Sequence, residues 1–183
     1  MKIGIAGCTG RMGQLLVKEV QNASDLYLAG GVTRDKDMLP ENVPILKDGE
    51  DLFAVSDLVI DFTAPDASVR HARMAASAKK PLLIGTTGIS ESQMADIKDA
   101  AQNAPILYTP NSSLGVNILM QFVKKAAKIL GTDYAIEILE AHHGKKVDAP
   151  SGTALALGKS AAEGRGISLS SKAVYDRHGH TGA

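Results

Sequence analysis

The feature that most limits the fold of this chain is a repeated alternation of short apolar runs with stretches of helical periodicity over about 110 residues. Each apolar run stops at a glycine or a threonine, and the apolar residues that follow recur at the spacing of one helix face. Strands are expected at residues 2–6, 26–32, 58–62, 81–84 and 105–108, helices at 11–23, 68–78 and 91–103, and a charged loop at 34–50. Ser90 is the candidate N-cap of the helix at 91–103. This alternation predicts an α/β fold with a doubly wound parallel sheet, in which crossover helices join the strands. The loops after such strands share one edge of the sheet, where ligands bind.

The pattern changes after Asn111. The remaining elements are expected to be a long helix at 114–130, a two-faced strand at 134–140, a helix of small residues at 153–162 and a strand at 173–175. The change predicts a boundary near residue 113, between a Rossmann-like domain at 1–113 and a smaller α+β domain at 114–183.

Bulk composition argues against several classes of function. Lysines and arginines number 20, as do aspartates and glutamates, and the few aromatics include no tryptophan, so no nucleic-acid partner is expected. The single cysteine, Cys8, excludes an internal disulfide and fits a reducing compartment. No apolar run approaches the ~18 residues of a membrane span and no signal segment precedes the first strand. These features predict a cytoplasmic protein that has no membrane partner.

Three glycines lie in the turn after the first expected strand, in the pattern Gly7-x-x-Gly10-x-x-Gly13. Glycines at such a turn let a pyrophosphate approach backbone N–H groups at a helix N-terminus, whose dipole favours an anion. The spacing departs from G-x-G-x-x-G because Thr9 stands where the second glycine would be. A plain tight turn is the alternative, and Cys8 within it is interpreted as a packing residue rather than a nucleophile.

Two other loops at the same edge carry cofactor signals. After the second strand, Thr33 stands where an acid would bind the ribose of NAD, and Arg34 follows, which favours the 2′-phosphate of NADP over a merely exposed charged loop. After the fourth strand, Thr86 and Thr87 lie between glycines and are candidates for the nicotinamide ribose or carboxamide. A simple strand-ending turn is the alternative there.

Residues 140–154 hold the densest group of side chains in the sequence that could transfer a proton or bind an anion. A histidine is a natural proton donor near neutral pH, and lysines suit an anionic substrate, as do the N–H groups of Ser151-Gly-Thr153 at a helix start. A metal is not expected, because no third ligand has metal-like spacing and the neighbouring lysines would repel a cation. A solvated basic loop is the other alternative. The remaining histidines, His71, His178 and His180, are interpreted as surface or structural residues.

At these residues the chain resembles the dihydrodipicolinate reductase family of the lysine and diaminopimelate pathway. The matching stretches, which run in order along nearly the whole chain, are residues 7–13, 60–63, 84–88, 111–117 and 140–154, with 175–182 beyond them. The run at 140–154 is highly specific to that family. The resemblance implies an NADPH- or NADH-dependent oxidoreductase that reduces an unsaturated cyclic dicarboxylate, 4-hydroxy-tetrahydrodipicolinate, to tetrahydrodipicolinate.

The resemblance also implies the roles of individual residues. His142 is similar to the family's general acid, and Lys146 to the cation that binds substrate and stabilises developing negative charge. His143, Gly152 and Thr153 match positions that hold a substrate carboxylate. The positions that match the family's nucleotide contacts are Gly7, Cys8, Thr9, Gly10, Arg11, Met12, Arg34, Gly85, Thr86, Thr87, Thr109, Pro110, Asn111 and Ser112.

The family's chains continue beyond the point that corresponds to Ala183, with a part that completes the substrate-domain sheet and builds a homotetramer. The second domain is therefore expected to be an incomplete substrate-binding and oligomerisation domain, and the 183-residue product to be less stable and less active than a complete enzyme. Two other functions stay open: a nucleotide-binding module without turnover, and a two-domain dehydrogenase acting on another anion.

Overall fold

The computed structural model describes residues 1–35, 39, 42–142, 148–176 and 179–180. The chain divides into two compact units, Met1–Pro110 and Asn111–Ala183. Within the described residues, no helix has the length and apolar character needed to cross a lipid bilayer.

The first unit is built on a five-stranded sheet in which every pairing is parallel, and this confirms the predicted Rossmann-like architecture. Its spatial order is β2-β1-β3-β4-β5, with β1 at Lys2–Ala6, β2 at Tyr27–Val32, β3 at Leu58–Asp61, β4 at Leu82–Ile84 and β5 at Ile106–Tyr108. The register places Asp61 beside both Ala6 and Ile84, so these strands end level with one another. The first residue after each strand therefore lies at one edge of the sheet.

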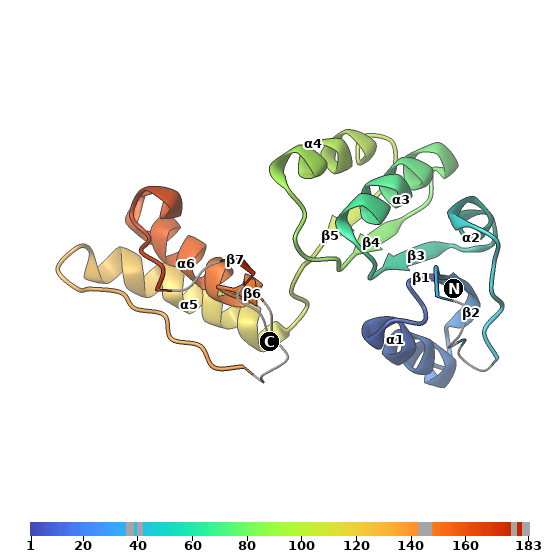
Figure 1. Cartoon of the computed structure of the whole chain (residues 1–183), viewed down its shortest axis with the longest axis horizontal. Coiled ribbons are helices and arrows are strands. Elements are labelled where there is room, and N and C mark those ends of the chain that lie inside the picture. Colours follow the sequence, from blue (N-terminus) through green and yellow to red (C-terminus); the bar gives the residue numbers. More distant parts are fainter. Residues whose placement is uncertain (36–38, 40–41, 143–147, 177–178, 181–183) are drawn as a thin grey trace. The chain divides into compact units, whose positions relative to one another are not determined.

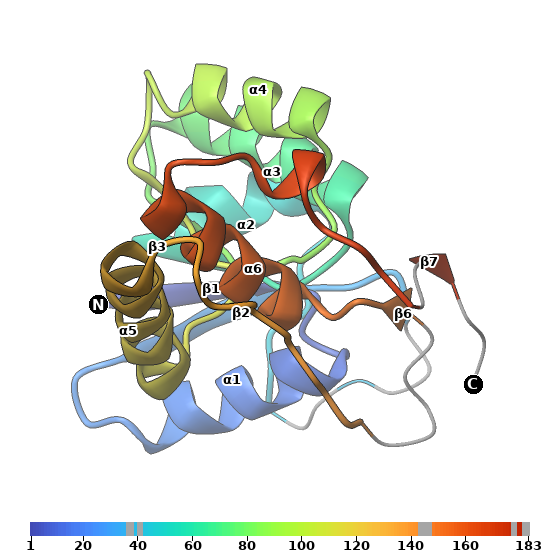
Figure 2. The same ribbon diagram turned by 90° about the vertical axis from the view of Figure 1, so that its left-hand side faces the viewer.

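Helices cover both faces of this sheet (Figures 1 and 2). Helix α1 (Arg11–Asn22) lies on one face, whereas α2 (Gly49–Val55), α3 (Pro65–Ala78) and α4 (Glu91–Ala100) lie on the other. The start of α4 confirms the predicted cap, because the Ser90 side chain accepts from Gln93 N and the Gln93 side chain accepts from Ser90 N.

Helix α2 corrects the expected loop over 34–50, since it begins at Gly49 inside that range. Asp48 starts the helix by accepting a hydrogen bond from Asp51 N, and Leu52 and Phe53 bury its inner side. A helix of this length is too short to show a helical repeat in the sequence, which is why the pattern missed it.

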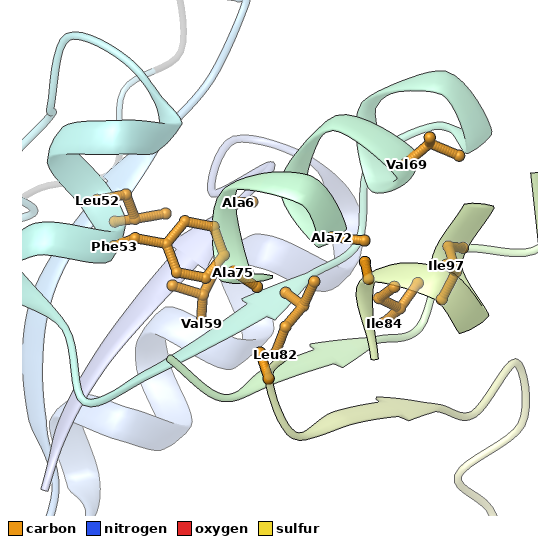
Figure 3. Close-up of a cluster of buried hydrophobic side chains, with 12 residues drawn as sticks. Ala6, Leu52, Phe53, Val59, Val69, Ala72, Ala75, Leu82, Ile84 and Ile97 are labelled. Atoms are coloured by element: carbon orange, nitrogen blue, oxygen red, sulfur yellow. The ribbon is translucent and has the colours of Figure 1, made fainter. Parts of the chain in front are cut away.

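Two apolar clusters form the core of the first unit. The larger lies between the sheet and α2, α3 and α4, where the Phe53 ring packs near Val59 and Ala75, and Leu82 and Ile84 continue the layer (Figure 3). The smaller cluster lies against α1 and includes Ile3, Ile5, Cys8, Val17 and Val20. Burial on both faces explains why the strands read as short continuous apolar runs rather than as alternating ones.

The second unit contains two long helices, α5 (Leu114–Leu130) and α6 (Gly152–Arg165), which pack closely. A Cβ added to Gly164 of α6 would lie 2.3 Å from the backbone oxygen of Lys124 in α5, so glycine permits this approach. The unit also has a 3₁₀ turn, η1 (Leu169–Ser171), and a two-residue antiparallel pairing of β6 (Asp148–Ala149) with β7 (Gly179–His180).

The strands expected at 134–140 and 173–175 are wrong, because both segments lack strand pairing in the structure. An alternating pattern makes an extended segment a strand only when another strand supplies hydrogen-bond partners. Among the described residues, none pairs with either segment. The alternation at 134–140 therefore identified an extended backbone but not a sheet.

Candidate active site

The turn between β1 and α1 has a backbone that requires glycine at two positions. Gly7 has a φ of +82°, and a Cβ on Gly13 would lie 2.0 Å from the Gly7 carbonyl oxygen. Gly10 occupies the N-cap of α1 and supplies no side-chain acceptor, in contrast to Ser90 at α4 and Ser151 at α6. The first N–H groups of α1, on the exposed Arg11 and Met12, therefore suit an external anion such as a pyrophosphate.

Cys8 is a buried residue of this turn. Its sulfur packs against Gly31, where an added Cβ would lie only 2.6 Å from Sγ. Burial raises the pKa of the thiol. A buried thiol with a raised pKa packs as a small apolar group.

The end of β2 is tied to the same turn. The hydroxyls of Thr9 and Thr33 are 2.5 Å apart, and the Thr33 hydroxyl also accepts from Asp35 N at 3.1 Å. Gln14 of α1 donates to the Thr9 carbonyl at 3.0 Å. The Thr33 side chain therefore holds the loop together, whereas Arg34 is exposed beside it.

A buried carboxylate stands at the end of β3. Asp61 is fully buried, and its oxygens accept from the hydroxyl of Thr63 at 2.6 Å, from the Thr86 hydroxyl at 3.4 Å and from Nδ1 of His71 at 3.1 Å. An ionised carboxylate only accepts, so Nδ1 of His71 carries the proton in this pair. His71 is a structural partner, as its interpretation allowed, but not an exposed one, because its side chain is only 12% exposed.

The loop after β4 has two threonines with different surroundings. The Thr86 hydroxyl faces inward, where it accepts from Thr63 N at 3.0 Å, and the residue is buried. Thr87 is exposed. Gly85 leaves room for the ring of Phe62, whose Cζ would lie 2.1 Å from an added Cβ.

The segment after β5 carries Thr109, Pro110, Asn111 and Ser112. Thr109 N donates to the Ile84 carbonyl at 2.9 Å, which fixes the end of β5 against β4. Asn111 accepts from Ser113 N at 2.9 Å just before α5 begins. The division between the two units falls between Pro110 and Asn111.

Glu140 organises the described part of the second unit's predicted site. One of its carboxylate oxygens accepts from Ser151 N at 2.8 Å, and the other lies 2.8 Å from Nε2 of His142. Partial burial would raise the pKa of Glu140, but the hydrogen bonds from Ser151 and His142 outweigh it and lower this pKa to about 2. The carboxylate is therefore ionised at neutral pH and holds the imidazole.

The start of α6 lies directly beyond this carboxylate. Ser151 caps the helix by accepting from Ala154 N at 3.0 Å, and no atom lies within 4 Å of a Cβ added to Gly152. Thr153 is exposed, and its hydroxyl accepts from the Asn111 amide at 3.4 Å. This open helix start fits a carboxylate.

Two predicted site residues, His143 and Lys146, lie outside the described residues. Within the ranges that are described, no three histidine, cysteine or acidic side chains gather as a metal site would require. Sequence reasoning did not single out Glu140 as a functional residue. Its place two residues before His142, on the same side of an extended chain, was the available signal.

A parallel sheet with a glycine turn at its switch point is the nucleotide-binding half of many oxidoreductases. Family models described as "Dihydrodipicolinate reductase, N-terminus" and "Dihydrodipicolinate reductase, C-terminus" match residues 1–112 and 115–181. The 4-hydroxy-tetrahydrodipicolinate reductase of Ruegeria sp. (strain TM1040) is 45% identical, covering 99% of this chain and 72% of the relative. The enzyme of the same name from Bartonella bacilliformis is 44% identical, covering 100% of this chain and 73% of the relative.

Solved structures agree with these sequence matches. The dipicolinate-bound dihydrodipicolinate reductase from Paenisporosarcina sp. TG-14 superposes with a TM-score of 0.76 at 27% identity, covering 99% of this chain and 71% of the other. Homoserine dehydrogenase of S. aureus, with a TM-score of 0.53 at 14% identity, covering 70% of this chain and 38% of the other, shares the fold alone. The chain belongs to the dihydrodipicolinate reductase family, whose members are NAD(P)H-dependent oxidoreductases.

Proposed function

We propose that this chain reduces 4-hydroxy-tetrahydrodipicolinate to tetrahydrodipicolinate with NADPH or NADH, as a step of lysine and diaminopimelate biosynthesis in the cytoplasm. The observation that carries the proposal is the Glu140 carboxylate, which holds both His142 and the N–H of Ser151. One carboxylate thereby joins a proton donor to a helix start that fits the carboxylate of a dicarboxylic substrate.

The two parts of the chain have separate tasks in this proposal. Residues 1–113 bind the dinucleotide, and residues 114–183 bind the small cyclic dicarboxylate and contribute to a homotetramer of the full-length chain. Neither a nucleic acid nor a membrane is part of the proposed activity.

The dinucleotide suits the edge of the first unit's sheet. A bound NADPH or NADH would supply the hydride. The N–H groups after Gly10 would hold its pyrophosphate, and the threonine loop at 85–87 would hold its nicotinamide half. The segment at 109–112 completes the set of cofactor contacts.

The exposed Arg34 favours NADPH, because a guanidinium binds a 2′-phosphate strongly and the Thr33 hydroxyl already bonds with Thr9. Replacing Arg34 with alanine should raise the KM for NADPH about tenfold or more while leaving the KM for NADH within about twofold, because one charge-assisted contact is removed. Steady-state kinetics with both cofactors measures this. Equal effects on the two cofactors would contradict the assignment.

His142 delivers the proton. Because its Nε2 bonds with the Glu140 carboxylate, the imidazolium keeps that proton and its Nδ1–H is the one available to the substrate. Glu140 thereby fixes the direction in which the ring presents its Nδ1–H.

The substrate carboxylates require cations and N–H donors. Gly152 and Thr153 offer backbone N–H groups at the start of α6, and His143 and Lys146 supply the side-chain contacts that the family resemblance implies. Lys146 also stabilises negative charge that develops on the substrate as hydride arrives.

The test is dinucleotide oxidation with enzymatically generated 4-hydroxy-tetrahydrodipicolinate by the wild-type chain and by His142→Gln and Lys146→Ala. We expect kcat to fall by about 10²–10⁴-fold for His142→Gln, the usual contribution of a general acid. Lys172→Ala is the matched control outside the proposed site and should retain wild-type rates. Cofactor binding without substrate-dependent oxidation by the wild type would instead support a nucleotide-binding module.

A further inference from the structure

We propose that Asp61 and His71 are positioning residues that hold the loop at 85–87 for the nicotinamide half of the cofactor. The inference rests on the proposed function, because that function assigns this loop to the nicotinamide. Neither residue belongs to the expected set of cofactor contacts, and both act through Thr63 and Thr86.

The buried state of Asp61 is the first step of the argument. A carboxylate with no exposed surface is costly unless it is fully hydrogen-bonded or paired. Its three donors are the hydroxyls of Thr63 and Thr86 and Nδ1 of His71. Among the described residues, His71 is the only basic side chain within ion-pair distance of this carboxylate.

The second step is the link from Asp61 to the loop. The strand register sets Asp61 beside Ile84, which immediately precedes Gly85. The Thr86 hydroxyl accepts from Thr63 N at 3.0 Å and lies 3.4 Å from the Asp61 carboxylate, while the Thr63 hydroxyl binds the same oxygen at 2.6 Å. Asp61 therefore fastens the loop after β4 to the loop after β3.

The third step concerns the far side of the histidine ring. His71 comes from α3, and a Cβ on Gly49 at the start of α2 would lie 3.2 Å from its Cδ2 and 3.5 Å from its Nε2. The ring is therefore confined between α2 and the carboxylate. This confinement fixes the direction of the Nδ1–H bond and, through Asp61, the orientation of both threonines.

The fourth step concerns the surface that the loop at 85–87 offers to a ligand. Because Thr86 turns its hydroxyl inward, the loop presents its backbone and the exposed Thr87 to a ligand. Losing the Asp61–His71 bond should free Thr86 to rotate and should loosen the nicotinamide half of the site more than the pyrophosphate half.

The experiment compares the Kd of NADPH with the Kd of 2′-phospho-ADP-ribose, which lacks nicotinamide, for four proteins. These are the wild type, His71→Leu, which removes the donor, His71→Asn, which keeps a donor near the place of Nδ1, and Thr86→Val, which removes the hydroxyl and keeps the shape. Thermal melts report whether each variant is folded. We expect His71→Leu and Thr86→Val to weaken NADPH binding about tenfold, to change 2′-phospho-ADP-ribose binding less than twofold, and His71→Asn to recover most of the loss.

Equal weakening of both ligands, or unchanged NADPH binding, in folded variants would overturn the positioning role. If His71→Leu does not fold, Thr86→Val decides the question, because it leaves the hydrogen bond between Asp61 and His71 intact. A wild-type chain that binds 2′-phospho-ADP-ribose and NADPH equally tightly would overturn the inference and leave the reductase open. A wild-type chain that binds neither would contradict the proposed function itself.

Discussion

Two carboxylate–histidine pairs, one in each unit, have nearly the same chemistry and very different surroundings. In the first unit, the Asp61 side chain is 0% exposed and His71 is 12% exposed. In the second, the Glu140 side chain is 27% exposed and His142 is 39% exposed. Each carboxylate also accepts from its neighbourhood, Asp61 from threonine hydroxyls and Glu140 from the Ser151 backbone.

The difference in exposure shows how burial changes the effect of a carboxylate–histidine hydrogen bond. A fully buried carboxylate has no water to replace a lost partner, so its main effect is on the stability of the fold. A half-exposed pair costs less to break, but its histidine can reach a substrate and exchange its proton. In the roles proposed above, the same pairing therefore positions a loop in the first unit and delivers a proton in the second.

The largest expected effect is on stability. Asp61→Leu leaves three donors, of which Thr86 is buried, without their shared acceptor and should lower the free energy of unfolding by about 3–5 kcal/mol. Glu140→Leu should cost about 1 kcal/mol, because water can replace the lost bonds. Urea denaturation followed by circular dichroism measures both losses of stability. Equal losses would contradict the larger contribution of the buried carboxylate.

The next expected effect is on turnover, where the Glu140–His142 pair matters more than the Asp61–His71 pair. Glu140→Gln removes the charge that holds the His142 ring and should lower kcat about tenfold, a part of the ~10²–10⁴-fold due to the acid itself. Glu163→Gln is the matched control, since Glu163 bonds with Lys124 at 2.8 Å away from the proposed site. A wild-type kcat for Glu140→Gln would remove the carboxylate from the proton-transfer step.

A smaller effect is expected on acid stability. The pKa of Glu140 is about 2 in the folded chain, below its ordinary value of 4.5. The ionised group therefore stabilises the fold fully above about pH 4.5, and this contribution is lost as the pH falls through about 2. The stability difference between wild type and Glu140→Gln, measured by urea denaturation along a pH series, should shrink across that window. A pH-independent difference would contradict the lowered pKa.

The smallest expected effect distinguishes a helix N-cap that only stabilises the fold from one that also lies beside the proposed substrate site. Ser90→Ala and Ser151→Ala each remove a helix N-cap and should each cost about 1 kcal/mol of stability. Only Ser151→Ala should also raise the substrate KM, because its helix start lies beside Glu140. Thermal melts and kinetics on both variants distinguish the roles, and identical KM values would weaken the assignment of α6 to substrate binding.

Elements with a strong local pattern could be predicted from the sequence. The helix at 114–130 was predicted to the residue because its apolar positions recur over many turns, and Ser90 was predicted as a cap because it starts such a pattern. The parallel sheet followed from the alternation of elements. In contrast, the strand at 134–140 was wrong because strand formation depends on a partner elsewhere in the chain.

The candidate sites divide in the same way. The glycines at 7 and 13 could be predicted because their constraint is local, in a single turn. The contact of His71 with Asp61 could not, because it depends on how α3 packs on the sheet. The bond between Glu140 and His142 is intermediate, since a spacing of two suggests it but only the structure supplies the Ser151 contact.

The most direct measurement of the central claim is the rate of NADPH oxidation that depends on added 4-hydroxy-tetrahydrodipicolinate, for the wild type and His142→Gln at saturating cofactor. The account predicts substrate-dependent oxidation by the wild type and a loss of about 10²–10⁴-fold in kcat for the variant, with NADPH binding unchanged. Equal rates for the two proteins would contradict the role of His142 as the proton donor that Glu140 holds.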